Sequence, residues 1–356
     1  MNNRIGYICF PYNSSLNTGR GHDRYAFELI RVVRESGIPT VVWEGSFLNT
    51  TGSGGLGTIA KGMLGGLTFP WLFRKPKVDI FHATSAIGGA TAACLRKKPL
   101  ITSILDVIPF HIQAGYDLAL KYRFKKGCIE TAARRSDLVI TLFESNRQTL
   151  IEKLRIPESR ILRIPLGLDH KKFYPGPEKS LSGTIVFLGE ATRSKGLDTL
   201  IEAMPKVLKK CPFATLKVAS YGRDLPALCS LAQSLGVSDH IHFSGFIPED
   251  KIRDFYLMGD CAVFPSRYGF GLPTLEAMAC GIPTIAGDTL DATEFVRDNG
   301  ILVKPGDTER LAEAIILLLT EEKARQGYIR KGLECARGYT WEAMGQKYLE
   351  AYRTFI

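Results

Sequence analysis

Short apolar runs alternate with segments of helical periodicity along the first half of the chain. The run Arg4–Phe10 is followed by a turn-rich stretch and then by apolar positions at helical spacing from Tyr25 to Val33. Four further runs have the length of strands: Thr40–Gly45, Val78–Ala83, Pro99–Leu105 and Asp137–Leu142. Because short buried strands that alternate with helices are typical of a parallel sheet covered on both faces, we predict a doubly wound α/β domain.

The alternation breaks at residues 164–177 and then starts again. This stretch is rich in proline, glycine and charge and has no period, so we interpret it as an interdomain linker. Five strand-length runs follow it: Thr184–Gly189, Leu216–Gly222, Ile241–Gly245, Cys261–Ser266 and Ile282–Asp288. We therefore expect two Rossmann-like domains, over residues 1–168 and 169–340, and a final helix, Trp341–Phe355, beyond the second sheet.

Composition places the chain among ordinary globular proteins. Its 356 residues suffice for about two domains, and 45% hydrophobic with 23% charged residues is a usual balance. The eight cysteines form no CxxC pair and no charged leader precedes a long apolar stretch, so we expect reduced thiols and a cytoplasmic protein. The longest apolar tract, residues 54–73, is broken by Lys61 and Pro70 and is not expected to span a membrane.

Positive charge is concentrated in the first half. Residues 1–168 carry a net charge of +11 and residues 169–356 a net charge of −1, which favours an anionic partner such as phospholipid, a lipid diphosphate or nucleic acid. The stretches Leu67–Lys77 and Lys121–Gly127 pair aromatic residues with cations, as at a lipid headgroup surface, although solvated helix faces have the same composition. Nothing is similar to a nucleic-acid recognition element, so we expect peripheral membrane contact and no nucleic acid.

Two strand-to-helix loops of the second domain carry candidate chemistry. In Gly189–Gly196, Arg193 and Lys195 stand at a predicted helix start. Cations are unfavourable at the positive end of a helix dipole unless a bound anion offsets them. The two residues therefore form either a phosphate clamp or a pair of solvated surface charges. In residues 266–287, Pro273 predicts a helix start and two glycines allow close backbone approach to a ligand. Glu276, one turn in, could accept hydrogen bonds from a ribose, or belong to an ordinary βαβ unit.

The first domain offers weaker candidates. A glycine loop, Gly19, Arg20 and Gly21, could bring its backbone close to a phosphate or to a second substrate, or simply form a turn. His82 at a strand end is predicted to face the interdomain crevice and His111 is a second candidate, although either could be structural. No zinc-like spacing and no Asp-x-Asp pair on a suitable loop is present, so we expect no metal and no cofactor.

The run FPSRYGFGLPTLEAMACGIPTIAG resembles the signature segment of the family 4 retaining glycosyltransferases, which have the GT-B fold. Three other stretches resemble the same family in order: IPLGLDHKKFYPG, FLG…KGLDTLIEAM and NGILVKPGDTERLAEAI. In the first half, DIFHAT, SILDVIPFH and the glycine loop have looser counterparts. The resemblance implies two doubly wound domains facing across a cleft, with helix 341–356 crossing back to complete the first domain.

Site residues follow from the resemblance position by position. It implies Lys195 on the diphosphate of a nucleotide diphosphate sugar and Glu276 on its ribose. It also implies the backbone of Phe270, Gly271 and Leu272 on the sugar, and Gly245, Phe246 and Ile247 beside the base. Three positions depart from the family. Either Tyr268, beside Gly269, stands in place of an acidic residue or the loop is one residue shorter. Glu190 stands in place of an arginine, and Leu105 in place of the histidine that precedes Asp106.

The resemblance predicts a metal-independent, retaining hexosyltransferase that uses a nucleotide diphosphate mannose or glucose. The acceptor would be a lipid-linked glycan or a polysaccharide in polysaccharide biosynthesis, and Asp106 would join Lys195 and Arg193 in catalysis. Two alternatives stay open: a non-catalytic nucleotide-sugar-binding homologue, suggested by Tyr268 and Leu105, and a nucleotide-sugar epimerase or hydrolase.

Overall fold

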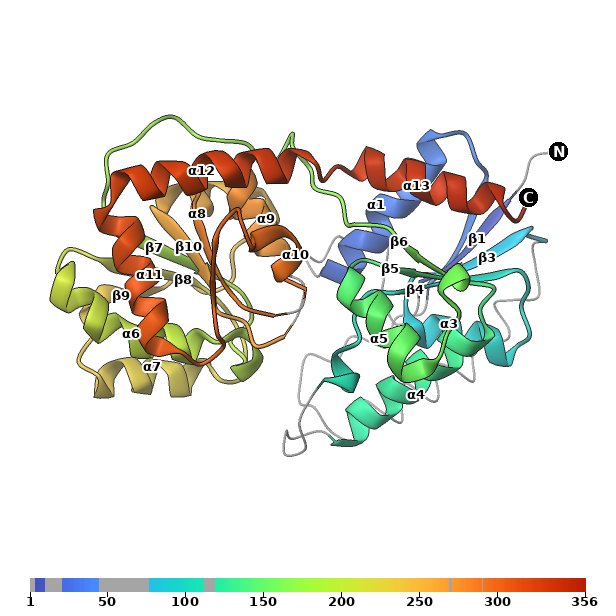
Figure 1. The fold of residues 1–356 in the computed structure, drawn as a ribbon, viewed down its shortest axis with the longest axis horizontal. Coiled ribbons are helices and arrows are strands. Elements are labelled where there is room, and N and C mark those ends of the chain that lie inside the picture. Colours follow the sequence, from blue (N-terminus) through green and yellow to red (C-terminus); the bar gives the residue numbers. More distant parts are fainter. Residues whose placement is uncertain (1–3, 10–20, 45–76, 112–118, 269–270, 290) are drawn as a thin grey trace. The chain divides into compact units, whose positions relative to one another are not determined.

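The computed structural model describes residues 4–9, 21–44, 77–111, 119–268, 271–289 and 291–356 (Figure 1). The chain forms two compact units. Unit 1 comprises Met1–Gly167 together with Trp341–Ile356, and unit 2 comprises Leu168–Thr340.

Unit 1 is built on a six-stranded parallel sheet. Its strands are β1 (Ile5–Cys9), β2 (Thr40–Glu44), β3 (Ile80–Ala83), β4 (Leu100–Ile104), β5 (Leu138–Thr141) and β6 (Ile161–Arg163). The spatial order β2-β1-β3-β4-β5-β6 reverses direction between β1 and β3. This order is that of flavodoxin-like doubly wound sheets, in which ligands bind beyond the carboxyl ends of the strands near such a reversal.

Helices cover both faces of this sheet. They are α1 (Gly21–Glu35), α3 (Ala86–Cys94), α4 (Ala119–Arg135), α5 (Glu144–Leu154) and α13 (Trp341–Arg353), with short 3-10 turns η2 (Ile108–Phe110) and η3 (Glu158–Arg160). Because strand side chains alternate between faces, Ile8, Ala83 and Leu100 join an apolar cluster with α3. Tyr7, His82 and Ser103 point to the opposite face.

The face that carries Tyr7, His82 and Ser103 is covered by α1 and α13, which pack against each other (Figure 1). Tyr348 and Tyr352 of α13 are fully buried there. The hydroxyl of Tyr352 is hydrogen-bonded to Tyr7 at 2.9 Å and to Nδ1 of His82 at 2.6 Å. The α13 segment, which follows unit 2 in the sequence, is therefore an integral part of the core of unit 1.

Unit 2 repeats the architecture with a different strand order. Its strands are β7 (Thr184–Leu188), β8 (Thr215–Ala219), β9 (Ile241–Phe243), β10 (Cys261–Phe264), β11 (Thr284–Gly287) and β12 (Ile301–Val303). The order β12-β11-β10-β7-β8-β9 is that of the dinucleotide-binding sheets, with its reversal between β7 and β10. The loops after β7 and β10 therefore meet where this class of sheet binds nucleotides.

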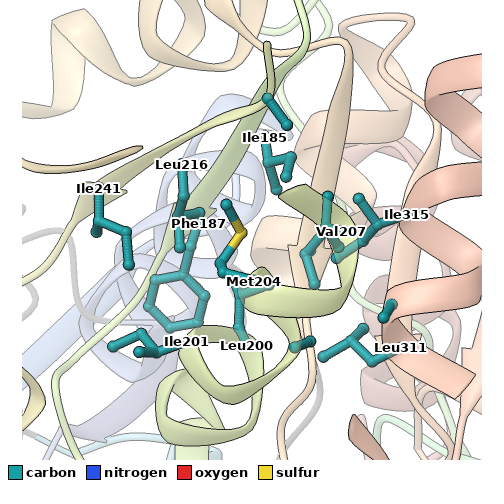
Figure 2. Packing of buried hydrophobic residues seen from close by; sticks show 14 of the residues in the cluster. Ile185, Phe187, Leu200, Ile201, Met204, Val207, Leu216, Ile241, Leu311 and Ile315 are labelled. Atoms are coloured by element: carbon teal, nitrogen blue, oxygen red, sulfur yellow. The ribbon is translucent and has the colours of Figure 1, made fainter. Parts of the chain in front are cut away.

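The helices of unit 2 pack on this sheet around a large apolar core. They are α6 (Leu197–Lys210), α7 (Leu225–Ser234), α8 (Ile252–Met258), α9 (Leu272–Ala279), α10 (Thr293–Val296), α11 (Thr308–Thr320) and α12 (Glu322–Arg337), with 3-10 turns η4 (Arg193–Lys195), η5 (Ser238–His240) and η6 (Glu249–Lys251). Figure 2 shows Leu200 and Met204 of α6 between Phe187 and Leu216 of the sheet and Leu311 of α11. This packing fixes the start of α6 relative to the end of β7.

Every strand expected from the sequence is present, with ends that differ by a few residues. Two edge strands, β6 and β12, were not expected. Each has three residues, and β6 also lies within two residues of the stretch assigned to the linker. The edge strand β9 is equally short, yet it was predicted, so length alone does not explain why β6 and β12 were missed.

Candidate functional site

The loops after β7 and β10 touch each other at the sheet reversal of unit 2. Gly196, which caps α6, has φ of +72°, and a Cβ built on it would lie 2.0 Å from the carbonyl oxygen of Pro265. A side chain is excluded here both by the left-handed backbone and by the neighbouring loop. Glycine at this position therefore allows η4 to lie directly against the segment that leads to α9.

Arg267 cross-links the same two loops. Its backbone N–H donates to the carbonyl of Ser194 at 2.8 Å, and its guanidinium donates to the backbone carbonyl of Arg193. The guanidinium also forms a two-pronged ion pair with Asp198 in the first turn of α6, at 2.9 and 3.0 Å. The 3-10 turn that carries Arg193 and Lys195 is thus held from the loop after β10.

Arg193 and Lys195 stand at the N-terminal end of α6, as expected from the sequence. Arg193 is exposed, whereas Lys195 is half-buried and its Cγ lies 4.0 Å from the position that a Cβ on Gly189 would occupy. Helix N-termini carry a partial positive charge that two further cations reinforce. The arrangement is therefore suited to binding an anion at the carboxyl end of β7.

Glu276 lies in α9 with only 3% of its surface exposed. The hydroxyl of Tyr256, in α8, donates to Oε2 of Glu276 at 2.9 Å and so fixes one carboxylate oxygen. The helix starts at Leu272 after Gly271, whose φ is +51°, so the sequence prediction of a start beside Pro273 is confirmed. Leu272, the first residue of α9, is itself buried.

An aromatic pair lies at the carboxyl ends of β8 and β9. Phe246 is 63% exposed and its ring contacts that of Tyr221, which is 46% exposed, in a T-shaped arrangement at 5.7 Å. Gly245, just before it, has φ of +71°, and Ile247 is half-buried. Exposed aromatic rings of this kind provide a flat apolar surface for a planar ligand.

In unit 1, Asp106 lies just beyond β4 and is almost fully buried. Both of its oxygens accept hydrogen bonds from Nζ of Lys125 at 2.8 Å, and Nε2 of His22, in α1, lies 3.7 Å from Oδ2. Burial alone would raise the pKa of Asp106, but Lys125 and His22 together hold it well below the ordinary value. Asp106 is thus an ionised carboxylate with a histidine beside it, supplied by α1 rather than by position 105, where Leu105 is buried.

His82 was expected to face an open crevice, but it lies in the core of unit 1. Its ring is fully buried, with Nδ1 bonded to Tyr352 and Nε2 to the hydroxyl of Ser103 at 2.8 Å. Burial lowers its pKa to about 3, so the ring is neutral near pH 7. The expectation that His82 faces a crevice and contacts an acceptor is wrong, because a residue near the strand end points inward whenever its face of the sheet is covered.

His111 is half-buried after η2, with Nε2 bonded to the hydroxyl of Thr149 at 2.9 Å. Burial and then Lys153 lower its pKa. Gly21 begins α1, and Tyr268 is half-buried next to Arg267. Gly19, Arg20, Gly269 and Phe270 lie outside the described residues.

Three side chains near these candidates were missed by the sequence reasoning: Arg267, Tyr256 and His22. Each acts on a partner far away in the sequence, which no local motif reports. Among the described residues, no group of three or more His, Cys, Asp or Glu side chains is placed to hold a metal ion. No helix in the described part of the chain combines the length and the apolar character needed to cross a membrane.

Two family models match adjoining parts of the chain. The family described as Glycosyl transferases group 1 matches residues 172–334, and the family described as Glycosyltransferase Family 4 matches residues 20–172. A GDP-mannose-dependent alpha-(1-6)-phosphatidylinositol monomannoside mannosyltransferase of Mycobacterium tuberculosis is 27% identical over 236 residues, which cover 60% of this chain and 61% of that protein. The match therefore spans less than two thirds of that relative.

A second curated relative extends the match. The O-antigen chain mannosyltransferase B of Escherichia coli is 22% identical over 80% of this chain and 76% of its own length. Solved structures share the fold over almost the whole chain. Sucrose-phosphate synthase from Thermosynechococcus elongatus has a TM-score of 0.82 at 20% identity, with 99% of this chain and 98% of that chain covered.

A further solved structure, the Anabaena protein HepE in complex with UDP and glucose, has a TM-score of 0.73 at 18% identity, with 98% and 99% of the two chains covered. The two family models leave only the ends of the chain unmatched, and the structural likeness extends across both units. The family and the fold expected from the sequence are thereby confirmed. The chain belongs to glycosyltransferase family 4, and its two doubly wound units are those of the GT-B fold.

Proposed function

We propose that this chain is a retaining hexosyltransferase that moves a sugar, mannose or glucose, from a nucleotide diphosphate sugar to a hydroxyl of a lipid-linked or polysaccharide acceptor. The observation that carries the proposal is the pair of loops at the sheet reversal of unit 2, in which Arg267 fastens the Arg193–Lys195 turn at the start of α6. Fixed cations at a helix N-terminus are suited to a diphosphate group.

The donor would contact unit 2 at three places. Lys195 and Arg193 bind the diphosphate, and the carboxylate of Glu276, oriented by Tyr256, accepts hydrogen bonds from the ribose hydroxyls. Phe246, with Tyr221 and the neighbouring Gly245 and Ile247, covers the base. The backbone of Gly271 and Leu272, at the start of α9, contacts the sugar and the phosphate next to it. The nucleotide sugar is a co-substrate, and no cofactor takes part.

In the proposed reaction, the bond between the anomeric carbon and the diphosphate oxygen breaks, and a bond to the acceptor oxygen forms on the same face of the sugar. The acceptor hydroxyl passes its proton to the departing phosphate, so the scheme needs no strong side-chain base. Negative charge grows on the leaving group, where Lys195, Arg193 and the N-terminus of α6 stabilise it. These fixed charges act in the place that a divalent ion would otherwise take.

Unit 1 would bind the acceptor. Asp106, held ionised by Lys125 and His22, is suited to orient an acceptor hydroxyl, and His111 directly follows the 3-10 turn η2 that comes after it. The mannosyltransferase of Mycobacterium tuberculosis is named for a phosphatidylinositol-linked substrate. Together with the net positive charge, which resides in the first half of the chain, this supports a cytoplasmic enzyme that acts peripherally at an anionic membrane surface.

The test is a calorimetric screen of UDP, GDP and ADP sugars followed by a product assay with the donor that binds. We expect saturable binding of one donor and acceptor-dependent release of its nucleotide, with the α-anomeric configuration of the donor kept in the product. Binding without turnover would identify a non-catalytic homologue, and nucleotide release without acceptor an epimerase or hydrolase. Either result would overturn the proposed transfer.

A further inference from the structure

A second group of cations surrounds a cavity of unit 1. It lies at the amino ends of strands β4, β5 and β6, whereas Asp106 lies beyond the carboxyl end of β4. The cavity has a volume of about 590 Å³ and is lined by Ala93, Arg96, Lys98, Arg134, Arg135, Ser136, Asp137 and Arg160. We call it the basic pocket. Its walls come from the ends of α3 and α4, which pack side by side, and from the turns that lead into β4, β5 and β6 (Figure 1).

The charge in the basic pocket is one-sided. Five of its eight lining residues are cations, and its one carboxylate, Asp137, is already engaged. Asp137 accepts hydrogen bonds from Nζ of Lys98 at 2.6 Å and from the backbone N–H of Leu100 at 2.7 Å. Among the described residues, no second carboxylate lines the pocket to balance the remaining positive charges, an arrangement that an anion would stabilise.

Helix capping does not account for all of these cations. Helix C-termini favour positive side chains, and α4 ends at Arg135. Its last carbonyls, however, are already bonded: Arg160 donates to Ala133 at 3.2 Å and to Arg134 at 3.1 Å, and Lys98 donates to Arg135 at 3.0 Å. Two cations are therefore sufficient to satisfy the helix end.

The side chains of the other three cations, Arg96, Arg134 and Arg135, donate no hydrogen bond to the end of α4. Their side chains are exposed, and none contacts a carboxylate or a carbonyl within the described residues. Arg96 also keeps a left-handed backbone, with φ of 53°, in the turn after α3. A planar guanidinium presents a fork of donors that matches two oxygens of a phosphate group, so three arginines around one cavity suit that chemistry better than a simple surface charge.

We propose that the basic pocket is a phosphate-binding site, separate from the donor site, that takes a phosphate or diphosphate group either as a soluble ion or as the headgroup of an anionic lipid. It lies at the amino ends of the strands, whereas substrates of doubly wound sheets bind beyond the carboxyl ends. The site is therefore suited to anchoring or regulation rather than to the transfer reaction.

The experiment compares the full chain with two variants that lose equal charge. The pocket variant is R96Q/R134Q/R135Q. The control variant is R155Q/K347Q/R353Q, which removes three exposed cations of unit 1 outside the pocket. Calorimetric titration with inorganic pyrophosphate is expected to show two classes of site in the unmodified protein and in the control. The pocket variant should bind at one class at least tenfold more weakly, because charge-assisted hydrogen bonds are lost.

The donor site is distinguished by Lys195→Ala, which should weaken only the other class. If Lys195→Ala has no effect while the pocket variant still loses a site, the donor proposal fails and the basic pocket stands. Equal pyrophosphate binding by the pocket and control variants would overturn the proposal.

The source of the phosphate is tested by cosedimentation with vesicles of phosphatidylcholine, with and without phosphatidylglycerol. Loss of phosphatidylglycerol-dependent binding in the pocket variant alone would support a lipid headgroup. Retained vesicle binding, together with lost pyrophosphate binding, would support a soluble anion.

Discussion

Lys195 is the side chain on which the proposed chemistry depends most. Lys195 ends the 3-10 turn that precedes α6, and Arg267 holds this turn. We expect Lys195→Ala to lower the turnover number by about a hundredfold or more, since removal of one fixed positive group from a developing oxyanion has effects of about this size. Measurement of the transfer rate at saturating donor separates this effect from weaker binding.

Lys209→Ala provides a matched control for this variant. Lys209 is an exposed lysine in the last turn of the same helix. Its replacement by alanine removes the same charge from unit 2, but far from the loops after β7 and β10. Its turnover should equal that of the unmodified protein. An unchanged turnover in Lys195→Ala itself would remove this residue from the mechanism.

Glu276 tests nucleotide binding rather than the chemical step. Replacement by Gln keeps the size of the side chain but removes the negative charge that would accept bonds from the ribose. We expect a roughly tenfold to hundredfold rise in the dissociation constant of the nucleotide, because hydrogen bonds to charged groups contribute about 1.5–3 kcal/mol. Calorimetry measures it, and Glu202→Gln, an exposed carboxylate on α6, serves as the control. Equal affinity in both variants would contradict the ribose role.

The sequence was sufficient to find the loops but not the side chains that hold them. Glycine, proline and charge spacing identified Lys195, Gly271 and Glu276 because each is local to a strand-to-helix turn. Arg267 and Tyr256 became visible only in three dimensions, since their partners are 69 and 20 residues away. His82 was misplaced for a related reason: a strand period says which residues share a face, but not which distant helix covers that face.

Among the described strands, two short edge strands were not predicted. Both β6 and β12 have three residues, but β9, an edge strand of the same length, was predicted, so short length alone does not explain the difference. The alternation of strands and helices fixed the doubly wound class. The strand orders differ between the two units, and this difference has no local signal because pairing joins strands that are not adjacent in the chain.

The contact between α13 and α1 can be tested at Gly345, where the two helices approach closely. A Cβ on Gly345 would lie 2.1 Å from Cγ1 and 3.0 Å from Cβ of Val32, so neither helix can accept it without moving. We expect Gly345→Ala to lower the free energy of unfolding of unit 1 by about 1–3 kcal/mol, as overpacking does in other cores. All three tryptophans belong to unit 1, so tryptophan fluorescence during denaturant unfolding reports on this unit.

Gly127→Ala is the matched control, because Gly127 lies on α4 of the same unit and a Cβ there meets nothing within 4 Å. This change should raise stability by up to about 1 kcal/mol through better helix propensity. Equal behaviour of the two variants would show that α13 does not pack tightly on α1 in solution.

Stability of unit 1 as a whole should depend on pH through His82. Burial lowers the pKa of His82 to about 3, below its ordinary value of 6.5. Between these values the unfolded chain binds a proton that the folded protein does not. The stabilisation is therefore complete above pH 6.5 and is lost as the pH falls toward 3, by up to about 1.4 kcal/mol per pH unit.

Tryptophan-monitored unfolding between pH 7 and pH 4 measures this dependence. In His82→Gln we expect lower stability at neutral pH, because the bonds to Tyr352 and Ser103 are disturbed, and a shallower fall on acidification. A slope identical to that of the unmodified protein would mean that other groups control the acid response.

The membership of α13 in unit 1 also sets an order of events on the ribosome. Unit 2 is one continuous stretch and has all of its strands once Thr340 has been translated. The sheet and α1, which emerge first, must wait, with Tyr7 and His82 of the sheet and Tyr25 of α1 uncovered, until Tyr348 and Tyr352 have been synthesised. The half of the protein that is made first is thus the half that finishes folding last, and a nascent chain stalled before residue 341 would expose this polar-aromatic surface to chaperones.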